Sequence, residues 1–167
     1  MATEDASILA QQKQQLESIL GAGTPACKFA MSGEQAGSIG EYKQTVVAAA
    51  SAVVLTTATS AQVASLALTA GDWDVSGYVG FVPGATTNIT VAQGSLSKTT
   101  AEIDSGNGYT WLWDAAGAVP GAVNFEGALP TVRFSLAAPA TIYLNAEGTF
   151  SVSTLGAYGT IRARRWA

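Results

Sequence analysis

The chain contains no histidine and a single cysteine, Cys27, among its 167 residues. Without histidine, Ser–His and Cys–His nucleophilic catalysis and most zinc sites are excluded. One cysteine cannot close a disulfide within the chain, and a free thiol is compatible with synthesis in a bacterial cytosol. A hydrolase that uses a pair of the chain's twelve acidic side chains remains the enzymatic alternative. No catalytic constellation stands out, however, and we expect a protein that is not an enzyme and has no metal or cofactor site.

Charge is also scarce, because only 12% of the residues are charged and the net charge is −4. An acidic balance of this kind excludes a generally basic nucleic-acid-binding protein. Hydrophobic residues make up 48%, which is too many for a disordered chain. A chain this apolar and weakly charged must either bury surface by self-association or carry a Ser/Thr-covered exterior, and we favour self-association.

No segment predicts secretion or insertion into a membrane. The first five residues are acidic where a secretory signal would be basic. The most apolar stretch, residues 45–68, is interrupted throughout by Ser, Thr and Gln, which argues against a membrane span. We therefore expect neither a membrane nor a nucleic acid as a partner.

Near the N-terminus, the pattern predicts a short helix that ends at Gly21, with Thr3 as its N-cap. Its apolar side chains, which are the candidate anchor residues, are Ile8, Leu9, Leu16, Ile19 and Leu20. Such a helix is marginal alone and must dock on a partner protein, on symmetry mates or on its own core. Residues 21–40 contain five glycines and predict an irregular connector. We thus expect an appendage over residues 1–40 and a body over 41–167.

The body shows the alternation of apolar and polar residues that is typical of strands. The alternating apolar sets are Val63, Leu66 and Leu68; Trp73, Val75, Val79 and Phe81; Tyr109, Trp111 and Trp113; Val132, Phe134 and Leu136; and Ile142, Leu144 and Ala146. Short strands separated by Gly, Pro and Ser turns predict a mainly β protein, an antiparallel β-sandwich of jelly-roll type. Residues 42–55 predict one or two further extended segments. Residues 117–127 predict a loop. Residues 129–166 predict an antiparallel meander with a turn at Glu147–Gly148.

Two motifs have weak support. The run from Asp72 to Gly77 copies the first half of a calcium loop, but Pro83 stands where a bidentate Glu is needed. We instead expect Asp72 and Asp74 on the solvent face of a strand, with Trp73 in the core. The pair Ser95 and Lys98 has the spacing of the nucleophile pair in serine β-lactamases. The partner motifs that this chemistry requires are absent, so we attribute the spacing to chance.

Two clusters are candidates for binding. Tyr109, Trp111 and Trp113 could stack on a sugar, although aromatic residues at alternate positions are more often core or interface residues. Arg162, Arg164 and Arg165 could bind phosphate or a capsid, could protect an edge strand, or could form intersubunit salt bridges, which is the interpretation we favour.

Two segments together resemble a known family. They are Leu68–Phe81, and Pro130–Leu136 through Thr141–Leu144 to Gly156–Arg165. These segments resemble the C-terminal β-domain of small virion proteins of tailed bacteriophages, which occurs in capsid decoration proteins, head fibres and tail fibres. The resemblance covers roughly residues 60–167. It implies a trimeric jelly-roll module whose variable N-terminal segment attaches it to the virion.

The resemblance implies several partners and a location. The expected partners are copies of the chain itself in a homotrimer, and the capsid or tail proteins of the phage. The segment available for a fibre shaft is short, which favours a capsid decoration or head-fibre protein. The alternative is a short tail-fibre or receptor-binding protein that recognises a host surface glycan. The expected location is the virion, after synthesis in the bacterial cytoplasm.

Overall fold

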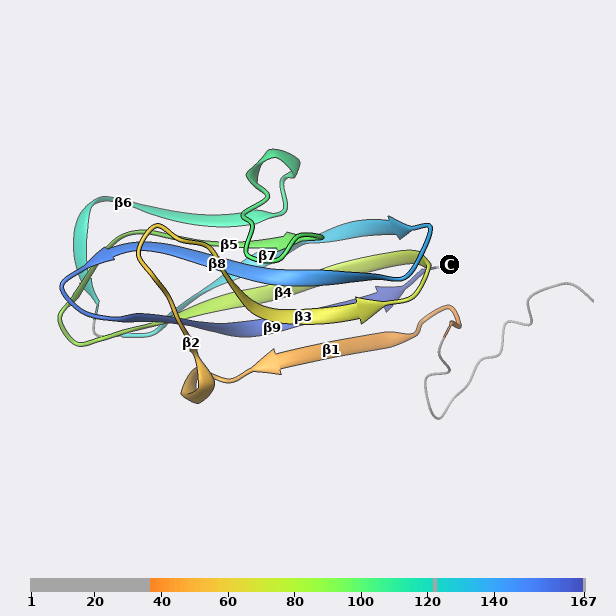
Figure 1. Ribbon diagram of the computed structural model, residues 1–167, viewed down its shortest axis with the longest axis horizontal. Coiled ribbons are helices and arrows are strands. Elements are labelled where there is room, and N and C mark those ends of the chain that lie inside the picture. Colours follow the sequence, from red (N-terminus) through yellow and green to blue (C-terminus); the bar gives the residue numbers. More distant parts are fainter. Residues whose placement is uncertain (1–36, 122, 167) are drawn as a thin grey trace, which may run out of the picture. The chain divides into compact units, whose positions relative to one another are not determined.

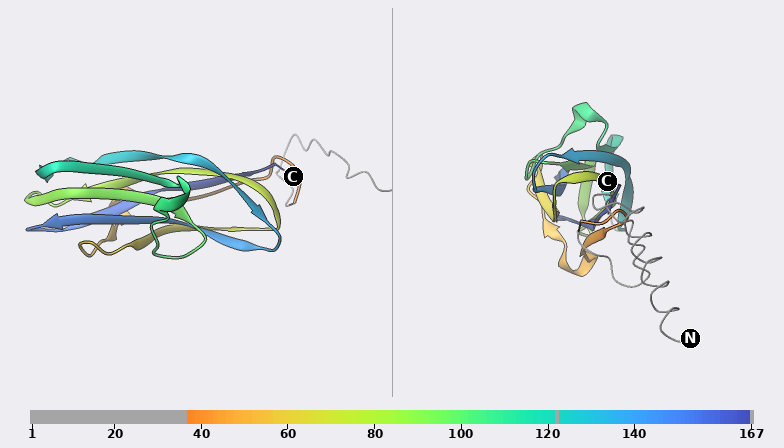
Figure 2. Two further views of the ribbon diagram at one scale, coloured as in Figure 1. Left: turned by 90° about the horizontal axis from the view of Figure 1, so that it is seen from above. Right: turned by 90° about the vertical axis from the view of Figure 1, so that its right-hand side faces the viewer.

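A computed structural model of the chain describes residues 37–121 and 123–166, which are shown in Figures 1 and 2. The chain divides into two units, residues 1–31 and 32–167, and the described residues belong to the second unit. The predicted helix with its apolar stripe of Ile8, Leu9, Leu16, Ile19 and Leu20 lies outside the described residues. The division into an anchor and a trimerisation domain therefore stays a prediction.

Two antiparallel sheets form the described unit. The first contains, in spatial order, β1 (Tyr42–Val47), β9 (Leu155–Arg165), β4 (Gly71–Pro83) and β7 (Phe125–Leu136), and the short β2 (Val53–Val54) also pairs with β9. The second contains β3 (Ala61–Leu68), β8 (Ala140–Ser151), β5 (Thr87–Ser97) and β6 (Thr110–Gly121). Two 3-10 turns, η1 (Ala49–Ser51) and η2 (Ser105–Asn107), lie in the connections. Strands far apart in the sequence are neighbours in this order, as they are in a double-sheet jelly roll, and the predicted antiparallel β-sandwich of jelly-roll type is confirmed.

The core lies between the two sheets and is built from the alternating apolar residues. Trp73, Val75, Val79 and Phe81 on β4 have no exposed surface, as the period of two predicts. On the opposite sheet, the inward residues of β8 are equally buried, and these are Ile142, Leu144 and Ala146. The predicted inward faces of the body are therefore confirmed, including Trp73 in the core beside the partly exposed Asp72 and Asp74.

The predicted meander over residues 129–166 is wrong. β7 and β9 lie in the first sheet with β4 between them, and β8 lies in the second sheet between β3 and β5. Alternation indicates which face of a strand is buried, but it does not indicate the neighbouring strand. From β6 to β9 the chain instead alternates between the two sheets, so β7, β8 and β9 each pair with strands far away in the sequence.

The predicted turn at Glu147–Gly148 is also absent, because β8 continues to Ser151. Gly148 is buried, and a Cβ there would overlap the side chain of Leu155, so this glycine serves packing rather than a turn. Similarly, the predicted loop over residues 117–127 is largely strand, since β6 continues to Gly121 and β7 begins at Phe125.

Most of the connections lie at the two ends of the sandwich, whereas the connection between β5 and β6 lies partway along it (Figure 1). The start of β1, the end of β9 and the β7–β8 turn lie at one end, and the turns after β4, β6 and β8 lie at the other. In the end-on view of Figure 2, the two sheets face each other around the core. The root of the N-terminal segment and the last strand thus meet at the same end.

Candidate functional site

Trp111 and Trp113, two of the three aromatic candidates, pack against the core. Trp111 stacks on Phe81 with ring centroids 6.2 Å apart, and Trp113 lies 5.4 Å from Phe125. Gly127 on the neighbouring β7 leaves room for the Trp111 ring, which a Cβ at that position would overlap. Both tryptophans are half-buried and close the sandwich between β6 and β7. Their packing accounts for their presence, and the sugar-stacking role stays a prediction for them.

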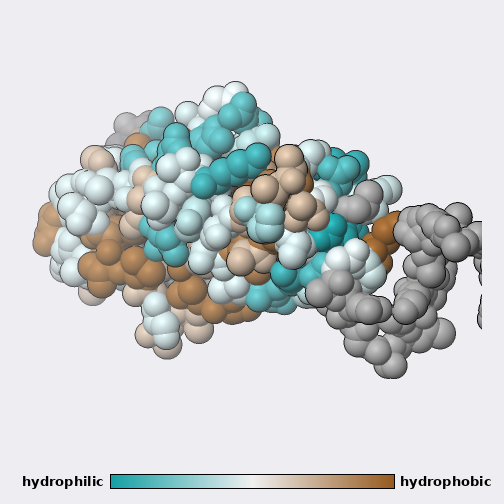
Figure 3. All heavy atoms as spheres, turned by 45° about the vertical axis from the view of Figure 1, so that its right-hand side comes forward, coloured by the Kyte–Doolittle hydropathy of each residue, from teal (hydrophilic) through white to brown (hydrophobic). Residues whose placement is uncertain are grey.

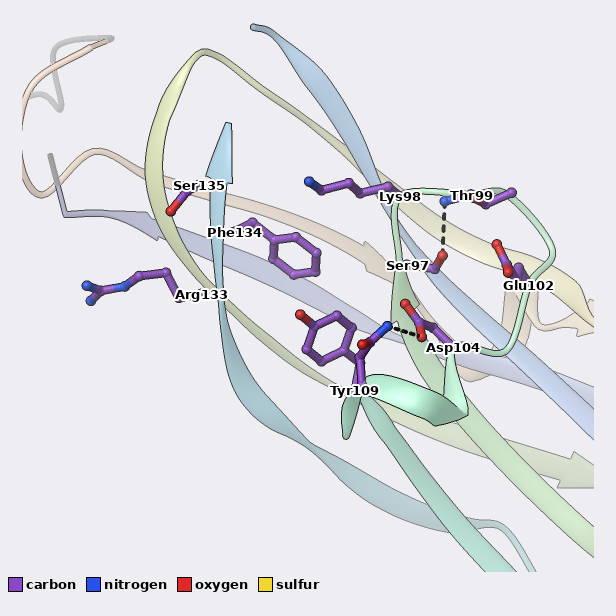
Figure 4. Close-up of a pocket in the computed structure, with 10 residues that line it drawn as sticks. Ser97, Lys98, Thr99, Glu102, Asp104, Tyr109, Arg133, Phe134 and Ser135 are labelled. Atoms are coloured by element: carbon purple, nitrogen blue, oxygen red, sulfur yellow. Dashed lines mark hydrogen bonds between the residues drawn. The ribbon is translucent and has the colours of Figure 1, made fainter. Parts of the chain in front are cut away.

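Tyr109, the third aromatic candidate, lies directly before β6 and packs on a different phenylalanine. Its ring is 5.5 Å from that of Phe134 on β7, and both rings border a groove of about 450 Å³ (Figure 4). This groove lies between β7 and the connection of residues 98–109, which we call the β5–β6 loop. We call the depression the loop groove.

Four charged side chains border the loop groove. Lys98, Glu102 and Asp104 come from the β5–β6 loop, and Arg133 comes from β7 (Figure 4). Lys98 Nζ lies 5.9 Å from the centroid of the Phe134 ring, a cation–π distance. Arg133 is paired with Asp74 on β4 at 3.1 Å, so the groove combines one lysine, two carboxylates and the ring of Tyr109.

The β5–β6 loop is held in place by a buried asparagine. Asn145 on β8 has no exposed surface and accepts a hydrogen bond from the N–H of Ala101 at 3.0 Å. Its Nδ2 donates to the carbonyl oxygens of Thr99 and Glu102 at 2.9 and 2.8 Å. Ala101 has a φ of 52°, a left-handed conformation that is unusual for a non-glycine residue. The three hydrogen bonds of Asn145 stabilise this backbone conformation.

Two buried serines on β5 extend the same arrangement. Ser97 Oγ accepts from the N–H of Thr99, and Ser95 Oγ accepts from the N–H of Asp104, each at 3.0 Å. Both serines face away from the core and under the loop. Buried polar side chains are costly unless they are hydrogen-bonded, so Ser95 and Ser97 are accounted for by their bonds to this loop.

The outer face of the first sheet carries Arg162 and Arg164, both exposed on β9. Arg162 Nε donates to Ser76 Oγ at 3.1 Å. Within residues 37–121 and 123–166, neither arginine has a carboxylate within ion-pair distance. Both remain candidates for intersubunit salt bridges.

Arg165, the third predicted charge candidate, is instead buried in its own chain. Alternation along β9 points it away from Arg162 and Arg164, and it is only 6% exposed. Its Nε lies 3.3 Å from a carboxylate oxygen of Glu41, and its guanidinium lies 4.6 Å from the Trp73 ring. The structure therefore separates Arg165 from the intersubunit candidates.

Glu41 is buried with 3% exposure directly before β1. Burial by itself raises the pKa of Glu41, but a hydrogen bond from the N–H of Gly37, a hydrogen bond from Arg165 and the charges of Lys43 and Arg165 together lower this pKa below its ordinary value. The backbone is paired here as well, since Arg165 N–H donates to the Glu41 carbonyl at 2.8 Å and Gly40 N–H donates to that of Arg165 at 3.0 Å. The Glu41–Arg165 pair thus fixes the first residues of the sandwich to its last strand.

Tyr158, on the outer face of the first sheet, lies over Gly80, where a Cβ would overlap its ring. Its hydroxyl donates to Glu126 at 2.9 Å, and Tyr78 contacts it edge-on at 6.5 Å. Burial and the hydrogen bond to Glu126 raise the pKa of Tyr158 to about 12. This tyrosine therefore stays protonated and keeps β4, β7 and β9 in register on this face.

An apolar strip follows the edge formed by β1 and the segment after it. Val46 is 56% exposed and Val54 is 74% exposed, and the exposed Ala48 and Ala50 lie between them. Figure 3 shows hydrophobic surface along this lower side of the sandwich. We call residues 46–54 the β1-edge strip.

Residues 37–121 and 123–166 contain no group of three or more His, Cys, Asp or Glu side chains that could hold a metal ion. Over the same residues, no helix has the length and hydrophobicity needed to cross a membrane.

Sequence reasoning missed several residues of these sites. It did not single out Asp104, Asn107 or Arg133 in the loop groove, or Asn145 beneath the loop, because their proximity depends on pairing between distant strands. Arg165 could have been separated from its neighbours by the alternation of Ile161 and Ala163, which predicts an inward side chain at position 165.

No known family matches this sequence, and neither does any curated protein. Among solved structures, the chain is similar to infectious bursal disease virus, Gx strain, with 12% identity and a TM-score of 0.43 over 73% of this chain and 32% of that chain. It is also similar to the T13 particle of this virus, with 13% identity and a TM-score of 0.42 over 77% and 32%. For the VP2 subviral particle of the same virus, the identity is 11% and the TM-score is 0.42, over 77% of this chain and 34% of that chain. The chain spans about a third of the length of these solved chains.

Proposed function

We propose that this chain is a structural virion protein of a tailed bacteriophage, a homotrimeric capsid decoration or head-fibre protein that attaches through residues 1–40. Jelly rolls occur in viral capsids, lectin domains and cupins, so the fold alone does not select among these roles. The observation that carries the proposal is the buried Glu41–Arg165 pair at the point where the N-terminal segment joins the sandwich.

The Glu41–Arg165 pair supports an anchor that is firmly joined to the domain it carries. Breaking a buried ion pair is costly, because the remaining partner is left as an uncompensated charge. In the proposed role, the pair transmits a force on the N-terminal segment directly to β9, an inner strand of the first sheet. The edge strand β1 therefore does not have to resist this force alone.

Two surfaces support self-association. The β1-edge strip exposes Val46 and Val54, and the neighbouring outer face carries Arg162 and Arg164 without carboxylate partners in the described part of the chain. A trimer that buries the strip and pairs these arginines with acids of the next subunit would present three anchors to a symmetric lattice. Repeated anchors increase the strength of attachment through avidity.

The solution mass of the full chain tests the trimer. We expect light scattering at micromolar concentration to give three times the 17.0 kDa of the chain. Val46→Asp together with Val54→Asp should lower the mass to that of a monomer, whereas Asp114→Asn, an exposed site on β6, should leave the trimer intact. A stable wild-type monomer would remove the avidity argument.

Co-sedimentation with particles of the encoding phage tests the anchor. Deletion of residues 2–20 should abolish binding and leave the near-ultraviolet circular dichroism of the sandwich unchanged. Leu9→Ser with Leu16→Ser should have the same effect, while Gln14→Ser, on the side of the predicted helix opposite the stripe, should bind normally. Particle binding by the deletion variant would place the attachment surface on the sandwich instead.

The second candidate function is that of a short tail-fibre or receptor-binding protein. It is favoured by the loop groove, where Tyr109 and Phe134 lie beside polar side chains. Adsorption of the phage to its host that is blocked by the purified protein would support this role over decoration.

A further inference from the structure

We propose that the loop groove is a binding site for an uncharged saccharide. The inference gives a ligand class to the groove on which the second candidate function rests, and it does not depend on the decoration role. It is carried by the composition of the groove and by the way its loop is held.

One wall of the groove is the ring of Tyr109. This ring packs on the buried Phe134, with centroids 5.5 Å apart, and borders the space between the β5–β6 loop and β7 (Figure 4). Aromatic rings supply apolar contact area to the C–H face of a sugar ring, and the Tyr109 hydroxyl adds a hydrogen-bonding group. Tyr109 is half-buried, so its ring is held by packing while one side remains accessible.

The rim of the groove suits hydroxyl groups rather than an ion. Lys98 supplies donors and Glu102 and Asp104 supply acceptors, while Arg133 at the border is paired with Asp74 Oδ1 at 3.1 Å. Asn107 adds an amide whose Nδ2 donates to Asp104 Oδ1 at 2.7 Å, which orients both side chains. Because each sugar hydroxyl both donates and accepts, a mixed set of this kind fits a polyol, and its excess of one carboxylate disfavours an anion.

The loop that presents these groups is preorganised. Asn145, Ser95 and Ser97 are buried polar side chains that make hydrogen bonds to the backbone of this loop, at Thr99, Ala101, Glu102 and Asp104. The left-handed Ala101 is stabilised by one of these bonds. Backbone conformations of this kind persist only where the surroundings determine them, and they cluster at binding sites. A loop fixed in advance reduces the entropy lost on binding.

The site can be tested with the full chain by saturation-transfer-difference NMR. The probes are the methyl glycosides of glucose, galactose, mannose, N-acetylglucosamine and N-acetylgalactosamine, each at about 10 mM so that a millimolar Kd is detected. Methyl glucuronide serves as the charged comparison. We expect saturation transfer to at least one neutral glycoside and a weaker signal for the glucuronide.

Variants locate the binding. Asp104→Ala and Asn107→Ala should each weaken the Kd for the neutral glycoside by about tenfold, because each removes a hydrogen-bonding group from the rim. Lys98→Ala tests the opposite side of the groove. Asp114→Ala, an exposed acid on β6 outside the groove, is the matched control and should bind as the wild type does. Thermal unfolding of each variant reports whether the sandwich is retained.

Three results would overturn the proposal. They are the absence of binding by every neutral glycoside, binding of the glucuronide alone, and binding that survives all three groove substitutions in folded protein. Loss of particle attachment on deletion of residues 2–20 has no bearing on this site, so failure of the virion role and failure of the sugar site are distinguishable.

Discussion

The Glu41 carboxylate accepts a hydrogen bond from Arg165 Nε at 3.3 Å, which joins two buried residues 124 positions apart. Arg165 also donates to the carbonyl oxygen of Ala70 at 2.8 Å and to the hydroxyl of Thr69. One guanidinium thus connects the segment before β1, the end of β9 and the β3–β4 turn. The stability of this end of the sandwich should depend on its ion pair.

Glu41→Gln should lower the free energy of unfolding by about 3 kcal/mol near neutral pH, because the Arg165 charge is left buried without its partner. The folded-state pKa of Glu41 is lowered, so its stabilisation is complete above about pH 4.3, the value in an unfolded chain, and is lost as the pH falls through the folded-state pKa. Urea unfolding should therefore show a large difference at about pH 7 and a small one at about pH 2.

The control for this measurement is Glu102→Gln, which alters an exposed carboxylate and should change stability by less than about 0.5 kcal/mol. A difference between Glu41→Gln and wild type that is independent of pH would show that the ion pair is not its cause.

Gly77→Ala should destabilise the first sheet, because a Cβ at Gly77 would overlap the backbone carbonyl oxygen of Thr160 on β9. Backbone cannot move aside as a side chain can, so we expect a loss of about 3 kcal/mol in the free energy of unfolding. Gly106→Ala in η2 is the matched control, since nothing lies within 4 Å of its Cβ position. Equal denaturation midpoints for the two variants would contradict the close approach of β4 and β9.

Trp111→Ala should cost about 3 kcal/mol of stability, because the ring packs on Phe81 and over Gly127 between the sheets. Trp166→Ala is the comparison, since Trp166 is 57% exposed and contacts Arg133 through a cation–π distance of 4.6 Å. That contact is worth about 0.5–1 kcal/mol at an exposed site. Equal losses of stability in Trp111→Ala and Trp166→Ala, measured by thermal unfolding, would contradict the packing of Trp111 and favour its role as a sugar-stacking surface residue.

Asn145→Ala should release the β5–β6 loop while the rest of the sandwich stays folded. The substitution leaves the Ala101 N–H and the carbonyl groups of Thr99 and Glu102 without their partner, at a total cost of about 3 kcal/mol. Hydrogen exchange followed by mass spectrometry should show faster exchange over residues 99–104 and unchanged exchange in β4. Asn88→Ala on β5 serves as the control. Unchanged exchange of the β5–β6 loop in Asn145→Ala would show that the hydrogen bonds of Asn145 do not hold the loop in place.

The strands were largely predictable because each buries one face. The period of two in Trp73, Val75, Val79 and Phe81 directly reflects a physical constraint on a half-buried strand, and the structure buries all four. The limits of β8 were not predictable in the same way, since Gly148 looks like a turn residue and is instead buried against Leu155. A glycine indicates either a turn or a close contact with another part of the chain. Only the residue that packs against it in the folded structure distinguishes the two.

The pairing of strands and the composition of the loop groove could not be predicted from local patterns. Asn145 and Ser95 look like ordinary polar residues on the solvent face of strands, and only the path of a loop from elsewhere buries them. Similarly, Asp104 and Arg133 reach the same groove because β6 and β7 are the edge strands of opposite sheets. These relationships are set by contacts of long sequence separation.

The position of β9 between β1 and β4 has a consequence for synthesis. β9 is the last strand of the sandwich to be translated, yet it is the one that the first strand and the long β4 both need as a neighbour. Until it emerges from the ribosome, the nascent chain must expose two unsatisfied strand edges and one open side of its core. Premature termination before residue 155 should consequently yield chains that aggregate or are degraded, rather than a smaller domain that folds.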